Sequence, residues 1–153
     1  MPTRISVFLD TSTLFAGIWS AEGGARMILK LGEAEAIRLL VSSQVLEEME
    51  RALRRKAPAL LGLLAMLLDR SRVEVLPSPT PQRVKESQAL VGHPGDAQVL
   101  AAAWDAHADY FVTLGREHFL ENTALQEAIP FPMGTPGDFL AWYRAYLSKK
   151  AAD

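Results

Sequence analysis

The stretch that decides the fold is Ile5-Ser6-Val7-Phe8-Leu9-Asp10-Thr11-Ser12. Its first five residues are mostly apolar, β-branched or aromatic, which is typical of a buried strand. An acid and hydroxyl residues follow at once. A carboxylate after a buried strand lies at the carboxyl edge of the sheet, where open α/β folds bind their ligands. If the chain has a chemical centre, we expect Asp10 to be part of it.

The composition excludes several classes of protein. The chain has 153 residues, enough for one domain, which we expect at residues 1–147 with a polar tail at 148–153. The absence of cysteine excludes a disulfide scaffold, thiol catalysis and cysteine zinc sites. A net charge of −2 means that nucleic-acid binding requires a local basic patch. With no membrane-length apolar run and no signal peptide, we expect a soluble cytoplasmic protein.

Strand patterns and helix patterns alternate along the chain. Strands are expected at residues 5–9, 36–41, 73–76, 110–113 and 129–131. Helices are expected at residues 25–31, 44–56, 59–70, 81–90, 96–107, 117–125 and 136–147, with a loop directly after Asp10. Ser42-Ser43, Thr80 and Thr135 are the expected helix caps. This alternation predicts a parallel sheet with helices on both faces.

The expected helix at residues 59–70 carries more leucine than one helix face can hold. A helix that is apolar on nearly all sides is buried on both sides. It is therefore either a deep core helix or an interface with a second copy of the chain or another partner. A homodimer is the oligomeric state that we expect.

Three acids lie where strands end or helices begin: Asp10, Glu48 and Asp96. In a parallel sheet with right-handed crossovers these positions share one edge. Each acid also has a structural interpretation, Asp10 and Asp96 as caps and Glu48 as an ion-pair partner of nearby arginines. The order of the three acids in an alternating chain favours a shared site.

A shared site of three carboxylates needs a proton or a cation, because like charges repel one another. Oxygen ligands without histidine or cysteine favour Mg²⁺ or Mn²⁺. Such an ion lowers the pKa of bound water and offsets the charge of a scissile phosphate. The chemistry that fits is phosphodiester hydrolysis.

Four stretches, three of which contain these acids, resemble the motifs of the PIN-domain ribonucleases, a family that includes the toxins of many bacterial and archaeal toxin–antitoxin pairs. The similar stretches are residues 7–14, 43–53, 96–103 and 108–120. Residues 135–140 resemble the start of the family's final helix, so the resemblance covers nearly the whole chain. In the second stretch, Glu48 followed by Met49 matches the family pattern better than Glu47 does.

The resemblance implies a three-layer α/β/α sandwich with a central parallel sheet, and RNA cleavage with Mg²⁺ or Mn²⁺. By matching motif, the catalytic and metal-binding acids are Asp10, Glu48 and Asp96. Ser12 would support Asp10 or Asp96 by hydrogen bonding, and Thr113 would line the same edge. The partners that the resemblance implies are an RNA substrate and a small antitoxin protein.

The chain departs from the family pattern at Gly115, which stands where the family commonly has the Asp of a Thr-x-Asp sequence. Asp109 precedes the fourth strand and is expected at the opposite edge of the sheet, so it does not substitute. Three acids can still hold one metal with several waters, but a second metal would bind poorly. The alternative function is therefore a catalytically weakened or inactive PIN-like module that binds RNA or a protein partner.

Basic residues near the acids could contact RNA phosphates. Arg51 and Arg55 follow Glu48 by three and seven positions, which places them on its side of the helix. Arg116 follows the fourth strand. For each arginine, a solvated or ion-paired surface residue is the alternative interpretation.

The three histidines carry less information. His118 follows the fourth strand and is a candidate for proton transfer, or is a surface residue. His93 and His107 have no arrangement that suggests metal ligation.

Phosphotransfer proteins also place an Asp at the end of a first strand. A phosphatase of the haloacid dehalogenase type needs a second Asp two positions later, where this chain has Ser12. The acidic pair and late lysine of a receiver domain are not evident. A dinucleotide-binding fold needs Gly-x-Gly-x-x-Gly after the first strand, and the sequence lacks it. These classes fit less well than a PIN-type nuclease.

Overall fold

The computed structural model describes residues 4–152 of the chain. Five strands form one parallel sheet in the order β3-β2-β1-β4-β5. Their bounds are β1 Ser6–Leu9, β2 Arg38–Ser42, β3 Glu74–Leu76, β4 Tyr110–Val112 and β5 Met133–Gly134. The first strand lies in the middle of the sheet, paired with β2 on one side and β4 on the other. The predicted parallel sheet is confirmed.

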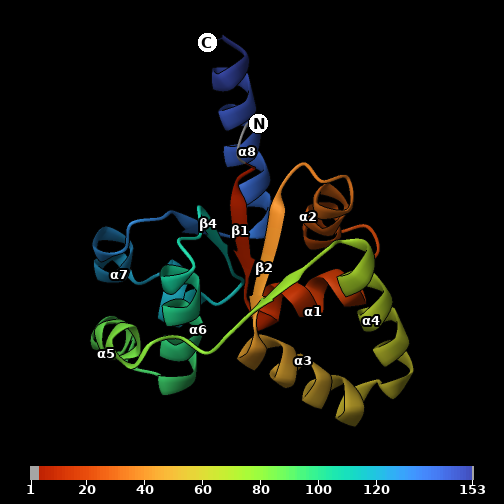
Figure 1. The fold of residues 1–153 in the computed structure, drawn as a ribbon, viewed down its shortest axis with the longest axis horizontal. Coiled ribbons are helices and arrows are strands. Elements are labelled where there is room, and N and C mark those ends of the chain that lie inside the picture. The colour runs from red at the N-terminus through yellow and green to blue at the C-terminus, as the bar shows by residue number, and fades with distance from the viewer. Residues whose placement is uncertain (1–3, 153) are drawn as a thin grey trace.

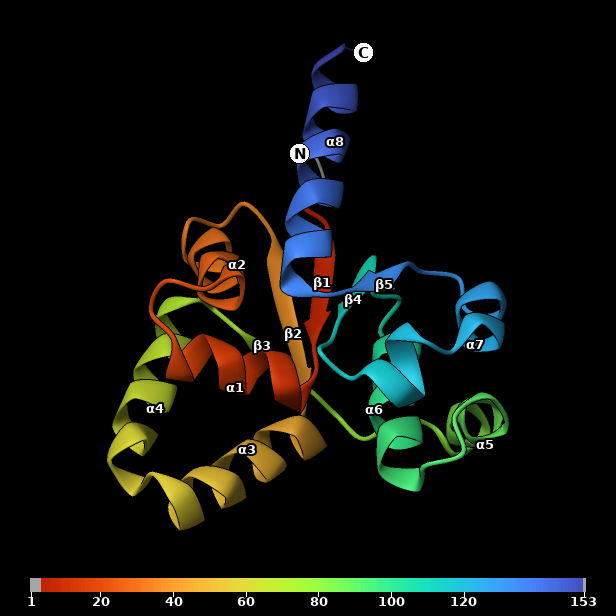
Figure 2. The same ribbon diagram turned by 180° about the vertical axis from the view of Figure 1, so that it is seen from behind.

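Helices connect the strands. They are α1 Thr11–Trp19, α2 Gly24–Glu33, α3 Ser43–Lys56, the 3-10 turn η1 Pro58–Leu60, α4 Leu61–Arg70, α5 Pro81–Leu90, α6 Pro94–Asp105, the π-helix η2 Arg116–Leu120, α7 Thr123–Ala128 and α8 Pro136–Ala152. The strands run outward from β1 to β3 and then cross back to β4 and β5. Right-handed crossovers therefore place α1 to α4 on one face of the sheet and α5 to α7 on the other, as Figures 1 and 2 show. This is the predicted three-layer α/β/α sandwich.

The core lies around β1, whose four residues are all buried. A strand that is covered on both faces has a continuous apolar run rather than an alternating one, which explains the sequence of β1. Phe8 pairs in register with Phe111 of β4, and their rings stack with centroids 5.4 Å apart. Burying each such side chain contributes roughly 1.5–3 kcal/mol to the hydrophobic stabilisation.

Residues 11–19 form helix α1, so the predicted loop after Asp10 is wrong. Asp10 caps this helix, because its Oδ1 accepts the N–H of Thr13 at 3.0 Å. Leu14 and Ile18 are buried four positions apart on one helix face. The run of hydroxyl residues is typical of a turn, but the burial of this apolar face stabilises a helix instead.

The last strand is Met133–Gly134 and not the predicted 129–131. Ile129 and Phe131 are buried in the core, so their apolar character reflects packing rather than a strand. Pro130 lacks an N–H donor and cannot pair in both directions. The second strand is also shifted, since β2 begins at Arg38 rather than at residue 36.

Helix α8 extends through Ala152, so the described part of the predicted polar tail at 148–153 is helical; residues 1–3 and 153 lie outside the described residues. Its start is the predicted cap: Asp138 N donates to Thr135 Oγ1 at 3.1 Å, and Thr135 N donates to Asp138 Oδ2 at 3.0 Å. The helix projects beyond the sheet in Figure 1. Within residues 4–152, no helix has the length and apolar character needed to cross a membrane.

Helix α4 is neither a deep core helix nor buried on both sides. Leu64 and Leu67 are buried, whereas Met66 is 45% exposed. The helix packs against α1 and α3, and its residues Gly62, Ala65, Met66 and Asp69 are exposed. The partner interface predicted for this helix stays a prediction.

Candidate active site

The side chains of interest gather at the carboxyl edge of the sheet, between β1 and β4. The chain leaves β1 toward β2, whereas β4 leads away in the opposite direction to β5. Ligands of open α/β folds bind at such a switch point. A pocket of about 650 Å³ opens there, and Asp10, Glu48 and Asp96 all line it. The structure thus brings together the three acids that the sequence predicted to converge.

Asp10 is held by three donors. Its Oδ1 accepts the Ser12 hydroxyl at 2.7 Å and the Thr13 amide at 3.0 Å, and its Oδ2 accepts the Thr113 hydroxyl. Burial raises the pKa of the Asp10 carboxyl above its ordinary value of 3.8, although the hydrogen bonds from Thr113, Ser12 and Thr13 oppose this rise. A nearby cation would favour the charged form of this buried carboxylate.

Glu48 joins three helices. Its Oε2 accepts the hydroxyl of Thr11 in α1 at 2.8 Å, and its Oε1 accepts the side-chain amide of Gln44 in α3 at 2.9 Å. Gln44 also donates to the carbonyl oxygen of Gly95 in α6 at 3.2 Å. The glutamate carboxylate is therefore oriented by the first turns of α1, α3 and α6.

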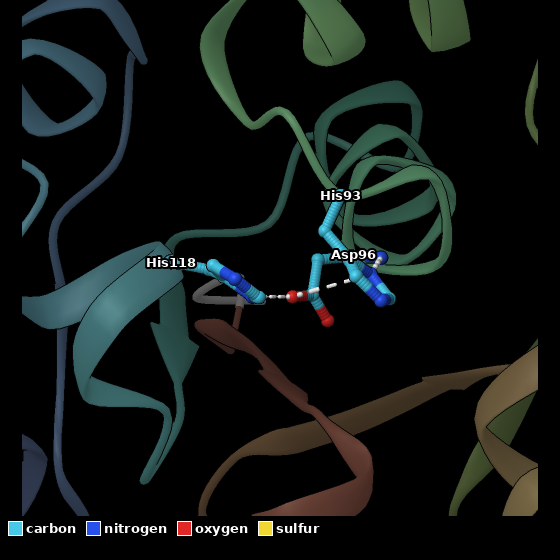
Figure 3. A group of neighbouring side chains, drawn as sticks. All are labelled: His93, Asp96 and His118. Atoms are coloured by element: carbon cyan, nitrogen blue, oxygen red, sulfur yellow. Dashed lines mark hydrogen bonds and ion pairs between the residues drawn. The ribbon is translucent and has the colours of Figure 1, made fainter.

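Asp96 lies in the first turn of α6 and is not its cap. His93 is the cap, since its Nδ1 accepts the Asp96 amide at 3.3 Å. His118, from η2, forms a hydrogen bond through Nδ1 with Asp96 Oδ2. Figure 3 shows the three side chains together, and one ligand atom from each lies within 4.8 Å of those of the other two. The expectation that His93 has no ligating arrangement is wrong.

The electrostatics of the pocket combine acids with helix N-termini. Helices α1, α3 and α6 begin beside it, with the caps Asp10, Ser42 and His93. Each helix N-terminus carries a partial positive charge, which reduces the repulsion among nearby carboxylates. Asp10, Glu48 and Asp96 line this pocket from three separate elements, whereas the ligand atoms that lie within 4.8 Å of one another in the described residues belong to His93, Asp96 and His118.

The predicted RNA-binding arginines lie in different places. Arg116 lines the pocket. Arg51 and Arg55 are exposed on α3 but are not among the lining residues, whereas Lys56, eight positions after Glu48, is one of them. The pocket thus faces the side of α3 that carries Glu48, Ala52 and Lys56, next to the side that carries the two arginines.

Sequence reasoning missed several side chains at this edge. Thr11 belongs to the hydroxyl run after β1, Gln44 precedes Glu48 by four positions, and His93 precedes Asp96 by three. Residues three or four positions apart lie on the same face of a helix. The spacings of Gln44 from Glu48 and of His93 from Asp96 were therefore a signal, visible in the sequence, that these side chains meet. Ser12, by contrast, bonds Asp10 as predicted, and Thr113, which was predicted only to line this edge, also donates to Asp10.

Gly115 stands at the turn after β4. Its amide donates to Thr113 Oγ1 at 2.9 Å, and an added Cβ would lie 3.2 Å from Phe119 Cδ2. The turn is packed around a residue without a side chain. The π-helix η2 follows and lets Glu117 and His118 line the pocket.

The predicted single helix at 117–125 is instead two, η2 and α7. Asn122 separates them and caps α7, since its Oδ1 accepts the amide of Leu125 at 3.0 Å.

Asp109 accepts the amide of Ser6 at 2.7 Å where β1 begins, at the opposite edge of the sheet, as predicted.

Comparisons with known proteins give one family and a set of similar folds. No curated protein matches the chain. The VapBC2 structure from Rickettsia felis, bound to a promoter DNA fragment, is similar with a TM-score of 0.65 and 18% identity over 85% of this chain and 98% of that one. The DNA-bound VapBC structure from Salmonella typhimurium is similar with a TM-score of 0.66 and 19% identity over 87% of this chain and 99% of that one. VapC20 from Mycobacterium tuberculosis, a toxin that cleaves the sarcin–ricin loop, is similar with a TM-score of 0.54 and 16% identity over 75% of this chain and 94% of that one.

These likenesses, all below 25% identity, concern the fold. The family is given by sequence: a family model described as the PIN domain matches residues 6–117, a span that contains Asp10, Glu48, Asp96 and Thr113. The resemblance drawn from the motifs is confirmed, and the chain belongs to the PIN domain family.

Proposed function

We propose that the chain is a metal-dependent endoribonuclease of PIN type, which hydrolyses RNA phosphodiesters and acts as a toxin with a small antitoxin partner. The observation that carries this proposal is that Asp10, Glu48 and Asp96, from three separate elements, line one pocket of a PIN domain. The similar VapBC complexes support an antitoxin partner, and the RNA-cleaving VapC20 supports RNA as the substrate class.

Mg²⁺ or Mn²⁺ held by Asp10, Glu48 and Asp96 would supply positive charge against the scissile phosphate and a lower pKa for an attacking water. The hydroxyls around Asp10 hold its carboxylate in one orientation for this role. Lys56 and Arg116 line the pocket and contact the phosphates of the RNA. The basic surface continues over α3, where the exposed Arg51 and Arg55 bind RNA outside the pocket.

The test is the Asp10→Asn variant. Asparagine keeps a carbonyl oxygen for the Ser12 and Thr13 donors but removes the charge, so cleavage of pooled RNA is abolished. The melting temperature stays within a few degrees of wild type, because the variant no longer buries a carboxylate whose pKa burial raises. Asp69→Asn, an exposed acid on α4, is the matched control and cleaves like wild type. Full cleavage by Asp10→Asn, or equal loss of fold and activity, would count against the proposal.

A second candidate is a non-catalytic module that binds RNA or a protein, and Gly115 favours it. Gly115 has no side chain, so this position supplies no carboxylate, and the only acid of this described segment that lines the pocket is Glu117 in η2. Retained RNA binding, without cleavage of any pooled substrate in Mg²⁺ or Mn²⁺, would favour this function. The homodimer and the cytoplasmic location stay predictions from the sequence.

A further inference from the structure

The cluster of His93, Asp96 and His118 borders the pocket, which Asp96 and His118 line, and differs chemically from the other acids of the pocket. One carboxylate oxygen, Asp96 Oδ2, bonds the Nδ1 of His118 and lies 3.6 Å from the Nδ1 of His93. The two imidazole rings face each other, with centroids 5.1 Å apart and planes inclined by 20°. Figure 3 shows both rings turned toward the carboxylate. Three potential metal ligands therefore converge on one point.

The backbone fixes two of these ligands together. His93 caps α6 and Asp96 lies in the first turn of the same helix, so their separation is set by helix geometry. His118 comes from the π-helix η2, whose backbone is tied by the Asn122 side-chain amide to the His118 carbonyl at 3.3 Å. The cluster thus joins two elements, α6 and η2, at the pocket wall.

The cluster is open to solvent on one side. The side chains of His93, Asp96 and His118 are 57%, 29% and 41% exposed. An ion can therefore enter without local unfolding and keep water in the remaining coordination positions. Three protein ligands with open positions are typical of catalytic zinc sites and of the two-histidine, one-carboxylate centres.

Imidazole nitrogen distinguishes between metals. Mg²⁺ prefers carboxylate oxygen and water, whereas Zn²⁺ and related transition ions bind imidazole well. We propose that His93, Asp96 and His118 form a binding site for a divalent transition ion of the Zn²⁺ class, which differs from the all-carboxylate set by its two imidazole ligands. Asp96 belongs to both sets, so occupation of the histidine site withdraws one carboxylate from the other acids. This site does not depend on RNA cleavage by the chain.

The alternative is that His118 and Asp96 form only a proton-dependent ion pair and that His93 only caps α6. The chain offers an internal control, because it has three histidines and the third, His107, lies exposed beyond the opposite end of α6. His107 has a φ of 55°, a backbone conformation that asparagine tolerates. His107→Asn therefore removes one imidazole with little strain.

The experiment is a Zn²⁺ titration of the full chain without an affinity tag, followed by the ring ¹⁵N resonances of the three histidines. We expect one equivalent of Zn²⁺ to shift the ring signals of His93 and His118 and to leave those of His107 unchanged. Excess Mg²⁺ does not reverse the shifts. Equal shifts in all three rings, or shifts in none, would overturn the proposal in favour of the ion pair and the cap.

Calorimetry of variants gives an independent measurement. His93→Gln and His118→Gln each weaken Zn²⁺ binding by about tenfold or more, whereas His107→Asn binds like wild type. Asp10→Asn also keeps the Zn²⁺ site, since Asp10 is not among its ligands. Unchanged affinity in both glutamine variants would contradict the assignment. Neither of these measurements depends on RNA cleavage. A chain without nuclease activity would still bind Zn²⁺, and a chain without the zinc site would fail to bind Zn²⁺ whether or not it cleaves RNA.

Discussion

At the scale of single residues, Thr113 connects the ends of β1 and β4. Its side chain is completely buried where β4 ends. Its hydroxyl donates to Asp10 Oδ2 and accepts the amide of Gly115 at 2.9 Å. One hydroxyl therefore holds the carboxylate that follows β1 and the turn that follows β4.

Replacing this hydroxyl by a methyl group tests that role. Thr113→Val keeps the shape but leaves Asp10 Oδ2 and the Gly115 amide without this partner, so the free energy of unfolding falls by about 1–3 kcal/mol. Binding of Mn²⁺ weakens by about tenfold or more, because the carboxylate is no longer oriented. Urea denaturation and calorimetry measure the two effects. Thr113→Ser retains the hydroxyl and stays closer to wild type; identical behaviour of the two variants would contradict this account.

The three acids were predictable from sequence, and the histidine cluster was not. Asp10, Glu48 and Asp96 each follow a strand or begin a helix, and these local patterns are visible in the sequence. His118 meets Asp96 only because a π-helix turns it toward α6. A π-helix is rare and has no simple sequence pattern, so the approach of His118 to His93 could not be inferred.

At the scale of elements, two of the helical glycines, Gly32 and Gly62, have opposite surroundings. A Cβ at Gly32, in α2, would lie 2.4 Å from Leu39 Cδ1 and 2.8 Å from the Ser71 carbonyl oxygen. A Cβ at Gly62, in α4, would meet nothing within 4 Å. The first position is fixed by the close approach of α2 to β2, and the second is open.

Alanine at the two positions has opposite expected effects. Gly32→Ala lowers the free energy of unfolding by about 1–3 kcal/mol, because it overpacks a buried contact. Gly62→Ala raises it by up to about 1 kcal/mol, because alanine has the higher helix propensity. Urea denaturation of both variants checks the pair, and a stabilised Gly32→Ala would show that the sheet and α2 separate easily.

Asp105 links the end of α6 to the start of α5. Its carboxylate accepts the Thr80 amide at 2.7 Å and the Arg83 Nε–H at 3.2 Å. Burial by itself would raise the pKa of Asp105, but the hydrogen bonds from Thr80 and Arg83 lower it below the ordinary value of 3.8. The charged form is therefore favoured in the folded state.

This lowered pKa gives a pH-dependent contribution to stability. A carboxyl group with a lowered folded pKa stabilises the fold above its unfolded pKa, and the contribution is lost as pH falls through the folded value. Asp105→Asn thus costs about 1 kcal/mol at pH 7, and its difference from wild type shrinks below pH 3.8. Urea denaturation at pH 7 and pH 3 measures this. The exposed Asp69→Asn variant serves as the control, and a difference that is the same at both pH values would argue against the assignment.

Helices α3 and α5, which have side-chain caps, were predictable as elements, whereas α1 was not. Ser42 caps α3 by accepting the Val45 amide at 3.1 Å, and Thr80 caps α5 by accepting the Arg83 amide at 3.3 Å. Both caps follow from residue type and position. Helix α1 was missed because hydroxyl residues compete with a helix for backbone hydrogen bonds, and only the burial of its apolar face decides in its favour.

At the scale of the whole molecule, the alternation of strands and helices predicts a parallel sheet but not the order of its strands. The sequence contains no local pattern that pairs β1 with β4 rather than with β3. The observed order follows from which apolar surfaces fit together, such as the stack of Phe8 and Phe111. Local patterns therefore predicted the fold class, and the position of the switch point required the structure.

The central position of β1 also sets when the site can exist during synthesis. Asp10 and Thr113, which share a hydrogen bond, are 103 residues apart. At roughly 5–20 residues per second, the ribosome needs about 5–20 s to add that length of chain. During this interval β1 has been synthesised but β4, its second neighbour in the sheet, has not. The pocket is thus completed late in translation, and a chain released before β4 would lack the wall that orients its first acid.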